Sequence, residues 1–231
     1  MIQECIVLAG GLGTRLRSVV ADKPKCMAPV NDHPFLHYLL QYLIKQGITH
    51  VVLSLGYKSE QVIEWCEQAN LPLTLTYATE PEPLGTGGAI LNAISHIKGN
   101  DCIVVNGDTF FDVSLADLHT FHQQTASNLT LALKPMSEFE RYGSVQLDAQ
   151  GRVTAFLEKQ YCKEGLINGG VYLTSKAYLQ SLGLPQQFSF EKEVLEPQVN
   201  NQQVFGFVSD TYFIDIGIPA DYEQVQLDFR S

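Results

Sequence analysis

The order of apolar segments along residues 4–124 restricts the fold more than any other feature of this 231-residue chain. Short apolar runs typical of buried strands alternate with longer segments whose apolar residues repeat at helical spacing. The predicted strands are 4–9, 50–55, 73–79 and 102–105, and the predicted helices are 34–46, 59–69, 87–98 and 114–124. This alternation indicates right-handed βαβ units, a mainly parallel sheet and helices on both of its faces.

The helix predicted over 34–46 shows how local residues specify these elements. Its apolar residues recur at helical spacing, at Phe35, Leu36, Leu39, Leu40 and Leu43. Asp32 can cap this helix, Pro34 suits its first turn, and Gly47 ends it. Ser114, with an acidic residue three positions later, is a capping pattern for the fourth helix.

The second half of the chain, from about residue 126, has a different pattern. Strand-like segments separated by short turns come first, then two helices, two more strands and a last helix from about Pro219. The predicted strands are 128–135, 142–148, 152–159, 167–175, 204–209 and 211–216, and the helices lie near 175–182 and 190–199. Because no linker separates the halves, we expect one Rossmann-like, three-layer α/β domain over 1–231, with halves of about 1–125 and 126–231.

Charge and cysteine content exclude several classes of protein. The net charge of −10 argues against nonspecific nucleic-acid binding, which favours a basic surface. No apolar run approaches the roughly 18 residues of a membrane span, and the first residues lack the basic region of a signal peptide. The five cysteines are scattered and suit free thiols in a reducing compartment. We therefore expect a cytoplasmic protein with no membrane partner.

Residues 8–25, LAGGLGTRLRSVVADKPK, concentrate glycine and positive charge in this acidic chain. Three glycines fall within four positions directly after a predicted strand, and four basic residues follow against one acid. Successive free N–H groups in such a turn form a concave anion site, and glycine lets the backbone approach a ligand closely. Arg15 and Lys25 can then neutralise the charge of a phosphate group.

The glycine turn alone leaves three interpretations open. A dinucleotide-binding turn requires G-x-G-x-x-G, but Leu16 occupies the third glycine position, which disfavours an oxidoreductase. A Walker loop requires G-K-[ST], which the sequence does not contain. A purely structural turn with solvated cations remains the third.

Further motifs extend this pattern over the whole chain, which resembles the sugar-1-phosphate nucleotidyltransferases. LAGG-x-GTRL is followed by Pro24-Lys25 in the manner typical of that family. The companion motifs are EPLGTGGA (82–89), NGD (106–108), Tyr142-Gly143, Glu158-Lys159, NGGVY (168–172) and DIGIPADY (215–222). The resemblance implies a reaction of a nucleoside triphosphate with a sugar 1-phosphate that yields an NDP-sugar and pyrophosphate.

The resemblance also implies which residues hold the nucleotide and act in catalysis. Lys25 would span the nucleotide and sugar phosphates, and Arg15 would stabilise the departing pyrophosphate. Asp108 completes the predicted catalytic group. The implied nucleotide-binding residues are Leu8, Gly10, Gly11, Gly13, Thr14, Arg15, Glu80, Gly85, Thr86 and Gly88. The six histidines fall outside these motifs, so we interpret them as structural or surface groups.

Two aspartates at the ends of predicted strands are candidate metal ligands. Asp108 ends CIVVNGD and Asp215 lies in YFIDIG. Mg²⁺ takes oxygen ligands, commonly one or two carboxylates with phosphates and waters. Since the family pattern matches at both positions, we expect Asp108 and Asp215 to bind Mg²⁺ rather than to act as turn residues.

Glu80 indicates which nucleobase the substrate nucleotide carries. Related thymidylyl and uridylyl enzymes carry a glutamine at this place, near the start of the EPLGTGGA loop. An ionised carboxylate only accepts hydrogen bonds, and guanine offers adjacent donors at its ring N–H and exocyclic NH₂. We therefore expect GTP as the substrate, with Glu82 as the rival candidate for this contact.

The sugar side of the family pattern is matched by a second set of residues. They are Asn106, Gly143, Glu158, Lys159, Asn168, Gly169, Gly170 and, ranked lower, Lys192. The runs PKCMAPVNDHPFL and NGDTFFD most resemble the branch that acts on D-glycero-α-D-manno-heptose 1-phosphate with GTP. Cys26 departs from the proline expected after Pro24-Lys25, and we interpret it as a buried, inert thiol.

Several alternatives stay open from the sequence. Mannose 1-phosphate is the close rival substrate, and glucose-1-phosphate thymidylyltransferase is a second activity within the class. A noncatalytic nucleotide-sugar-binding regulator would be expected to lose Lys25 or a metal aspartate, and this chain keeps all of them. The sequence leaves open whether the chain forms a homo-oligomer.

Overall fold

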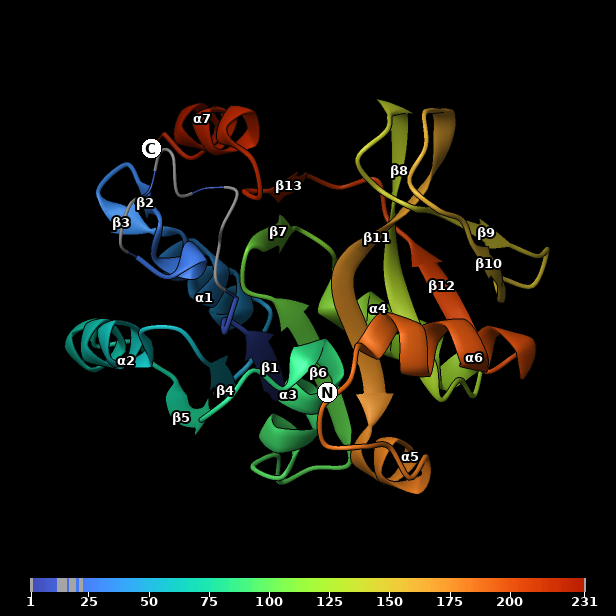
Figure 1. Ribbon diagram of the computed structural model, residues 1–231, viewed down its shortest axis with the longest axis horizontal. Coiled ribbons are helices and arrows are strands. Elements are labelled where there is room, and N and C mark those ends of the chain that lie inside the picture. Colours follow the sequence, from blue (N-terminus) through green and yellow to red (C-terminus); the bar gives the residue numbers. More distant parts are fainter. Residues whose placement is uncertain (1, 12–15, 17–19, 21–22, 231) are drawn as a thin grey trace.

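Four parallel strands form one end of the sheet in the computed structural model, which describes residues 2–11, 16, 20 and 23–230. They are β1 (Glu4–Leu8), β4 (His50–Leu55), β5 (Thr74–Thr79) and β6 (Asp101–Asn106), and they lie in the order β6-β1-β4-β5. Strand β1 pairs in parallel with both β4 and β6 (Figure 1). The parallel sheet expected from the first half of the sequence is confirmed.

Helices cover both faces of this sheet. One apolar core joins it to α1 (Phe35–Lys45), α2 (Ser59–Gln68) and α4 (Leu115–Gln124). A second core, on the other face, joins it to α3 (Gly85–Ile94), α5 (Lys176–Ser181) and α6 (Glu196–Asn200). The result is the predicted three-layer α/β fold. No helix in the described part of the chain is long and apolar enough to cross a bilayer.

The second half extends the sheet with antiparallel strands. Strand β11 (Cys162–Ser175) pairs antiparallel with β6 and with β8 (Leu129–Phe139), and β12 (Val204–Val208) pairs in parallel with β8. The short strands β9 (Ser144–Leu147) and β10 (Val153–Phe156) continue the sheet beyond β11. One mixed sheet therefore runs through both halves.

Two small strand pairs join distant parts of the chain. Strand β13 (Phe213–Asp215) pairs with β7 (Thr109–Phe111), which directly follows β6. Strands β2 (Pro29–Val30) and β3 (His33–Pro34) form a hairpin after the short 3-10 helix η2 (Lys25–Met27). The last helix, α7 (Pro219–Asp228), lies beside this hairpin, and Gln226 donates a hydrogen bond to the Pro29 carbonyl (Figure 1).

Several local expectations differ from the structure. Asp32 does not cap α1, because Pro34 takes the N-cap position in extended conformation while pairing in β3. Helix α3 spans Gly85–Ile94 rather than 87–98. Strand β11 begins at Cys162, before the predicted 167, because β8 extends the pairing to Phe139.

Glu4 anchors the segment that connects α3 to β6. Its carboxylate lies 2.7 Å from Nδ1 of His50 and accepts the backbone N–H groups of Lys98 and Gly99. Burial favours a higher pKa for Glu4, but these hydrogen bonds outweigh burial and the pKa lies below its ordinary value of 4.5. The ionised form is therefore the one that the fold stabilises.

Replacement of Glu4 by glutamine tests this tie. Because the pKa is lower in the folded state, the stabilisation is present above the unfolded pKa and is lost as pH falls through the folded pKa. We expect Glu4→Gln to lower the free energy of unfolding by about 1–2 kcal/mol at pH 7 and to show less acid dependence than the wild type. Urea unfolding at several pH values measures both, and parallel pH curves would contradict this role.

Candidate active site

The candidate site lies beyond the carboxyl ends of the parallel strands. The chain places β4 and β5 on one side of β1 and then crosses back to place β6 on the other. Ligands in open α/β sheets bind at such a reversal of strand order. Gly107, directly after β6, donates its N–H to the Leu8 carbonyl, and a Cβ at this position would lie 2.7 Å from that oxygen. Glycine is therefore required here for the two strand ends to approach.

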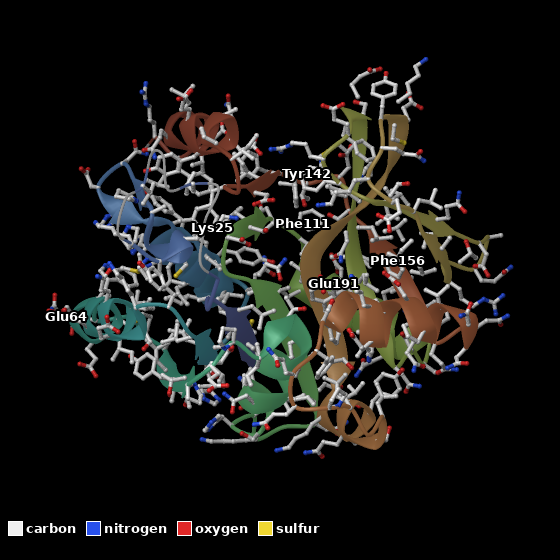
Figure 2. The ribbon with its side chains drawn as sticks, viewed as in Figure 1. Lys25, Glu64, Phe111, Tyr142, Phe156 and Glu191 are labelled. Atoms are coloured by element: carbon white, nitrogen blue, oxygen red, sulfur yellow. The ribbon has the colours of Figure 1, made fainter. Side chains whose placement is uncertain are left out.

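Two cavities open at this edge of the sheet and share a wall. The first measures about 590 Å³, and the second about 410 Å³. Asn106 and Glu191 line both cavities, Asp108 lines the first and Asp215 lines the second. In the view of Figure 2, Lys25 lies over the N-terminal half and Phe156 over the C-terminal half, with Glu191 between them. A ligand filling both cavities would pass Asn106 and Glu191, with Asp108 beside its first part and Asp215 beside its second.

Lys25 lies between the two predicted metal ligands. Its Nζ is 2.5 Å from Oδ2 of Asp108 and 3.3 Å from Oδ1 of Asp215. The β7–β13 pairing brings these aspartates together, because it sets Asp215 opposite Thr109, the residue after Asp108. Gly217 donates its N–H to Oδ1 of Asp215 at 2.8 Å. The predicted catalytic residues Lys25 and Asp108 are therefore in direct contact.

The charges of this cluster perturb one another. Burial raises the pKa of Asp215, the charge of Lys25 opposes this rise, and the charge of Asp108 adds to it. As a result, the pKa of Asp215 lies above its ordinary value. The two carboxylates thus repel each other in a partly buried setting, and a cation between them relieves the repulsion. Lys25 supplies that cation here, and its predicted contact with the substrate phosphates stays a prediction.

Most predicted nucleotide-binding residues line the first cavity. These are Leu8, Gly10, Gly11, Glu80, Gly85 and Thr86. Gly88 does not line it: a Cβ there would lie 2.3 Å from the Gln186 carbonyl, so this glycine lets α3 pack against the segment before η3. Gly13, Thr14 and Arg15 lie outside the described residues. The first cavity is thus lined by Gly10 and Gly11 of the glycine turn, by Glu80, which is the candidate for contact with the base, and by the start of α3.

Glu80 is held rigidly at the wall of the first cavity. Its Oε1 accepts a hydrogen bond from the Ser54 hydroxyl at 3.2 Å, and its Oε2 accepts one from the Leu84 N–H at 3.0 Å. Each carboxylate oxygen can accept more than one hydrogen bond. Glu80 therefore presents a fixed pair of acceptors to a ligand. Glu82 also lines this cavity but is exposed.

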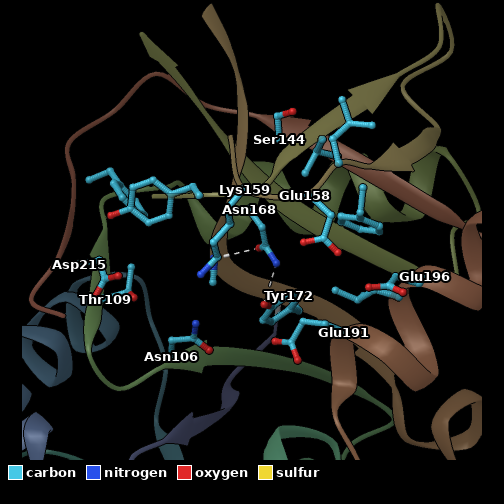
Figure 3. Close-up of a pocket in the computed structure, with 18 residues that line it drawn as sticks. Asn106, Thr109, Ser144, Glu158, Lys159, Asn168, Tyr172, Glu191, Glu196 and Asp215 are labelled. Atoms are coloured by element: carbon cyan, nitrogen blue, oxygen red, sulfur yellow. Dashed lines mark hydrogen bonds between the residues drawn. The ribbon is translucent and has the colours of Figure 1, made fainter. Parts of the chain in front are cut away.

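Predicted sugar-binding residues line the second cavity, which Figure 3 shows. These are Asn106, Gly143, Glu158, Lys159, Asn168 and Gly170. Gly169 does not line it, because its missing Cβ makes room for the Phe111 ring, 2.3 Å from where that atom would lie. Lys192 does not line it either, and its side chain is exposed. For Gly169 and Lys192 the structure thus supports no direct contact with a sugar.

The sequence did not identify several residues of the second cavity. Glu191, Tyr172 and Glu196 line it, with Tyr142 and Phe213 at the side of Asp215. The NGGVY and Tyr142-Gly143 motifs contained two of these residues, but only their neighbours were selected. Glu191 had no such signal, since F-S-F-E-K-E resembles a solvated helix start.

Cys26 follows the expectation of an inert thiol. It is buried, with Sγ 4.0 Å from the Ala9 carbonyl oxygen. Burial, with smaller contributions from Cys66 and Asp108, raises its pKa to about 12. The thiolate is therefore disfavoured although Lys25 is its neighbour in sequence.

Fold and site together define a class. An α/β sheet with a glycine turn at its switch point, two joined cavities and a lysine between two aspartates is the arrangement expected for transfer of a nucleotide onto a second, anionic substrate. The chain belongs to the nucleotidyl transferase family, whose family model matches residues 4–231.

Particular relatives match almost the whole chain. D-glycero-alpha-D-manno-heptose 1-phosphate guanylyltransferase of Aneurinibacillus thermoaerophilus is 48% identical, over 98% of this chain and 98% of its own length. The protein of that name from Campylobacter jejuni is 46% identical, over 95% and 96%. Among solved structures, HddC from Yersinia pseudotuberculosis complexed with GMP-PN has a TM-score of 0.88 and 36% identity, covering 99% of this chain and 100% of that one.

Proposed function

We propose that this protein is a magnesium-dependent guanylyltransferase. It transfers GMP from GTP to D-glycero-α-D-manno-heptose 1-phosphate, releases pyrophosphate and forms a GDP-heptose for surface polysaccharide or glycan synthesis. The observation that carries this proposal is the position of Lys25 between Asp108, which lines the first cavity, and Asp215, which lines the second. A nucleotide in the first cavity and a sugar phosphate in the second would meet at these two aspartates. The two relatives named above support the choice of heptose and GTP.

The aspartate pair fits a divalent cation. Asp108 and Asp215 already converge on one positive group, the Lys25 ammonium, and both carboxylates remain partly exposed toward the cavities. Among the described residues no third histidine, cysteine or acidic side chain joins them, so phosphate and water oxygens would complete the coordination. When bound, Mg²⁺ would neutralise phosphate charge near the reacting phosphorus.

The residues around the pair then have separate tasks. The glycine turn at Gly10 and Gly11 gives the phosphates close access to backbone N–H groups. A sugar-phosphate oxygen attacks the α-phosphorus in line, and pyrophosphate leaves, so the protein needs no nucleophile. Lys25 moves from the carboxylates to the phosphates and offsets the negative charge there. Catalysis consists of positioning and charge neutralisation.

Glu80 is the proposed determinant of base preference. We expect Glu80→Gln to lower the ratio of kcat/KM for GTP to kcat/KM for dTTP by about tenfold or more, because guanine loses a charged acceptor for two adjacent donors. Pyrophosphate release with each nucleotide measures the ratio. Glu82→Gln is the matched control in the same loop and is expected to keep the wild-type ratio. If the ratio changes in Glu82→Gln and not in Glu80→Gln, then Glu82 contacts the base and the role proposed for Glu80 is wrong.

The substrate pair is tested by pyrophosphate release over a matrix of nucleoside triphosphates and sugar 1-phosphates. GTP with the manno-configured heptose 1-phosphate is expected to give the highest kcat/KM. Mannose 1-phosphate is the informative comparison, since it lacks only the additional CHOH unit of the heptose. A higher kcat/KM with mannose or glucose 1-phosphate would overturn the proposed sugar.

A further inference from the structure

Glu191 lines both cavities, and it is not among the site residues predicted from the sequence. It is the first residue of the π-helical turn η3 (Glu191–Leu195), which precedes α6. With Asn106, it is one of the two residues that line both cavities. Single π-turns inside helices are rare and frequently lie at functional sites.

The carboxylate of Glu191 is fixed at one oxygen. Oε2 accepts a hydrogen bond from the Thr86 hydroxyl at 2.9 Å and another from the Ser189 hydroxyl at 3.0 Å. Thr86 in turn accepts the N–H of Phe190, also at 2.9 Å. Within the described part of the chain, Oε1 of Glu191 makes no hydrogen bond, so one acceptor is oriented and unused.

The backbone beneath Glu191 is anchored in the apolar core. Phe190 is buried, and its ring meets the Tyr172 ring edge-on at a centroid distance of 5.3 Å. Val194 and Leu195, in the same turn, are buried as well. A side chain on such a base, with Oε2 held by two hydroxyls, keeps its position without a ligand. This is the preorganisation that a binding residue requires.

Because Glu191 lines the second cavity as well as the first, its Oε1 can meet a ligand in the second cavity. Glu191 lies next to Tyr172, which lines only that cavity, and the charge of Glu191 adds to the burial that raises the pKa of Tyr172. Figure 3 shows Glu191, Tyr172 and Asn106 along one wall of the second cavity, with Asp215 and Thr109 at another side. An ionised carboxylate accepts hydrogen bonds and repels phosphate, so its partner in this cavity is a hydroxyl.

We propose that Glu191 is a substrate-binding residue that accepts a hydrogen bond from a sugar hydroxyl through Oε1. This inference rests on the proposed function, in which the second cavity holds the sugar 1-phosphate. It adds a carboxylate to the predicted sugar contacts. In the segment F-S-F-E-K-E, Glu191 then takes the sugar-binding role that the sequence had suggested for Lys192.

Steady-state kinetics of Glu191→Gln test the inference. Gln keeps one oxygen for Thr86 and Ser189 and replaces the other by an NH₂ group, which cannot accept. The KM for the sugar 1-phosphate is expected to rise about tenfold, as for loss of a charged hydrogen bond, while the KM for GTP stays within about twofold. Glu193→Gln is the matched control: Glu193 accepts the Ser189 N–H at 3.0 Å in the same turn but lines neither cavity. It should leave both KM values unchanged.

Deoxy analogues of the sugar 1-phosphate separate binding from a structural effect. With the wild type, kcat/KM should be about tenfold lower for the analogue that lacks the hydroxyl bound by Glu191 than for the parent sugar 1-phosphate. With Glu191→Gln, kcat/KM should be nearly the same for this analogue and for the parent sugar, because the variant has already lost that hydrogen bond. A uniform loss with every analogue, an unchanged sugar KM, or a rise in the GTP KM alone would overturn the inference.

The test also separates this inference from the proposed function. If the wild type prefers a hexose 1-phosphate to the heptose, the proposed sugar is wrong, and the Glu191 comparison is made with the preferred sugar. If the wild type turns over the heptose and Glu191→Gln matches it in all kinetic constants, only the role of Glu191 is wrong.

Discussion

Replacement of Lys25 by alanine is expected to lower kcat/KM by at least about 100-fold, the effect typical of removing a group that offsets charge in a transition state. Lys25 contacts both Asp108, which lines the first cavity, at 2.5 Å, and Asp215, which lines the second, at 3.3 Å. Without Lys25, no preplaced ammonium group offsets the negative charge that develops on the phosphates. Pyrophosphate release at saturating Mg²⁺ measures the loss. Lys23→Ala, at an exposed position two residues earlier, is the control and should retain activity.

The same variant should bind a divalent cation more tightly in the absence of nucleotide. Lys25 occupies the space between Asp108 and Asp215, so a metal ion competes with its ammonium group for both carboxylates. Removing the lysine removes the competitor and leaves two repelling carboxylates. Titration with Mn²⁺ should give a lower Kd for Lys25→Ala than for the wild type. A weaker or unchanged affinity would show that these carboxylates do not form the metal site.

Replacement of Gly85 by alanine is expected to destabilise the protein by about 2–4 kcal/mol. Gly85 has φ of +72°, and a Cβ there would lie 2.4 Å from the backbone oxygen of Phe188. Both the left-handed backbone and the collision with a main-chain atom oppose a side chain. The collision would also push the start of α3 away from the segment that carries Glu191. Urea unfolding measures the change.

Gly183→Ala is the matched control for this effect. Gly183 has φ of +61°, but no heavy atom lies within 4 Å of the Cβ position, so only the backbone cost of about 1–2 kcal/mol applies. The difference between the two variants isolates the contact between α3 and Phe188. Equal losses of stability in both variants would contradict the packing described for Gly85.

Local sequence pattern predicted the parallel half of the fold well, because each strand and helix there is specified by its own apolar period. The structure departs from the prediction where distant partners decide. Strand β11 is long because β8 accompanies it, and Pro34 leaves α1 because it pairs with Pro29 in the hairpin. Neither partner is visible in the local sequence. Pairing between distant segments therefore limits what periodicity can predict.

The candidate site was likewise predicted only in part from the sequence. Motif glycines identified the correct loops, but sequence does not distinguish a glycine that faces a ligand from one that admits a neighbouring chain segment, as Gly88 and Gly169 do. Glu191 could not be selected over Lys192, because the local sequence F-S-F-E-K-E does not show which of the two residues faces the cavities. The contact of Lys25 with both aspartates depends on the β7–β13 pairing, which joins segments about a hundred residues apart.

The most direct measurement of the central claim is a crystal structure with a nonhydrolysable GTP analogue and Mg²⁺. We predict the guanine against Glu80 in the first cavity, the phosphates over Gly10 and Gly11 with Lys25 turned toward them, and the metal ion on Asp108 and Asp215. Phosphates bound away from Lys25, or a metal ion that contacts neither aspartate, would contradict the account.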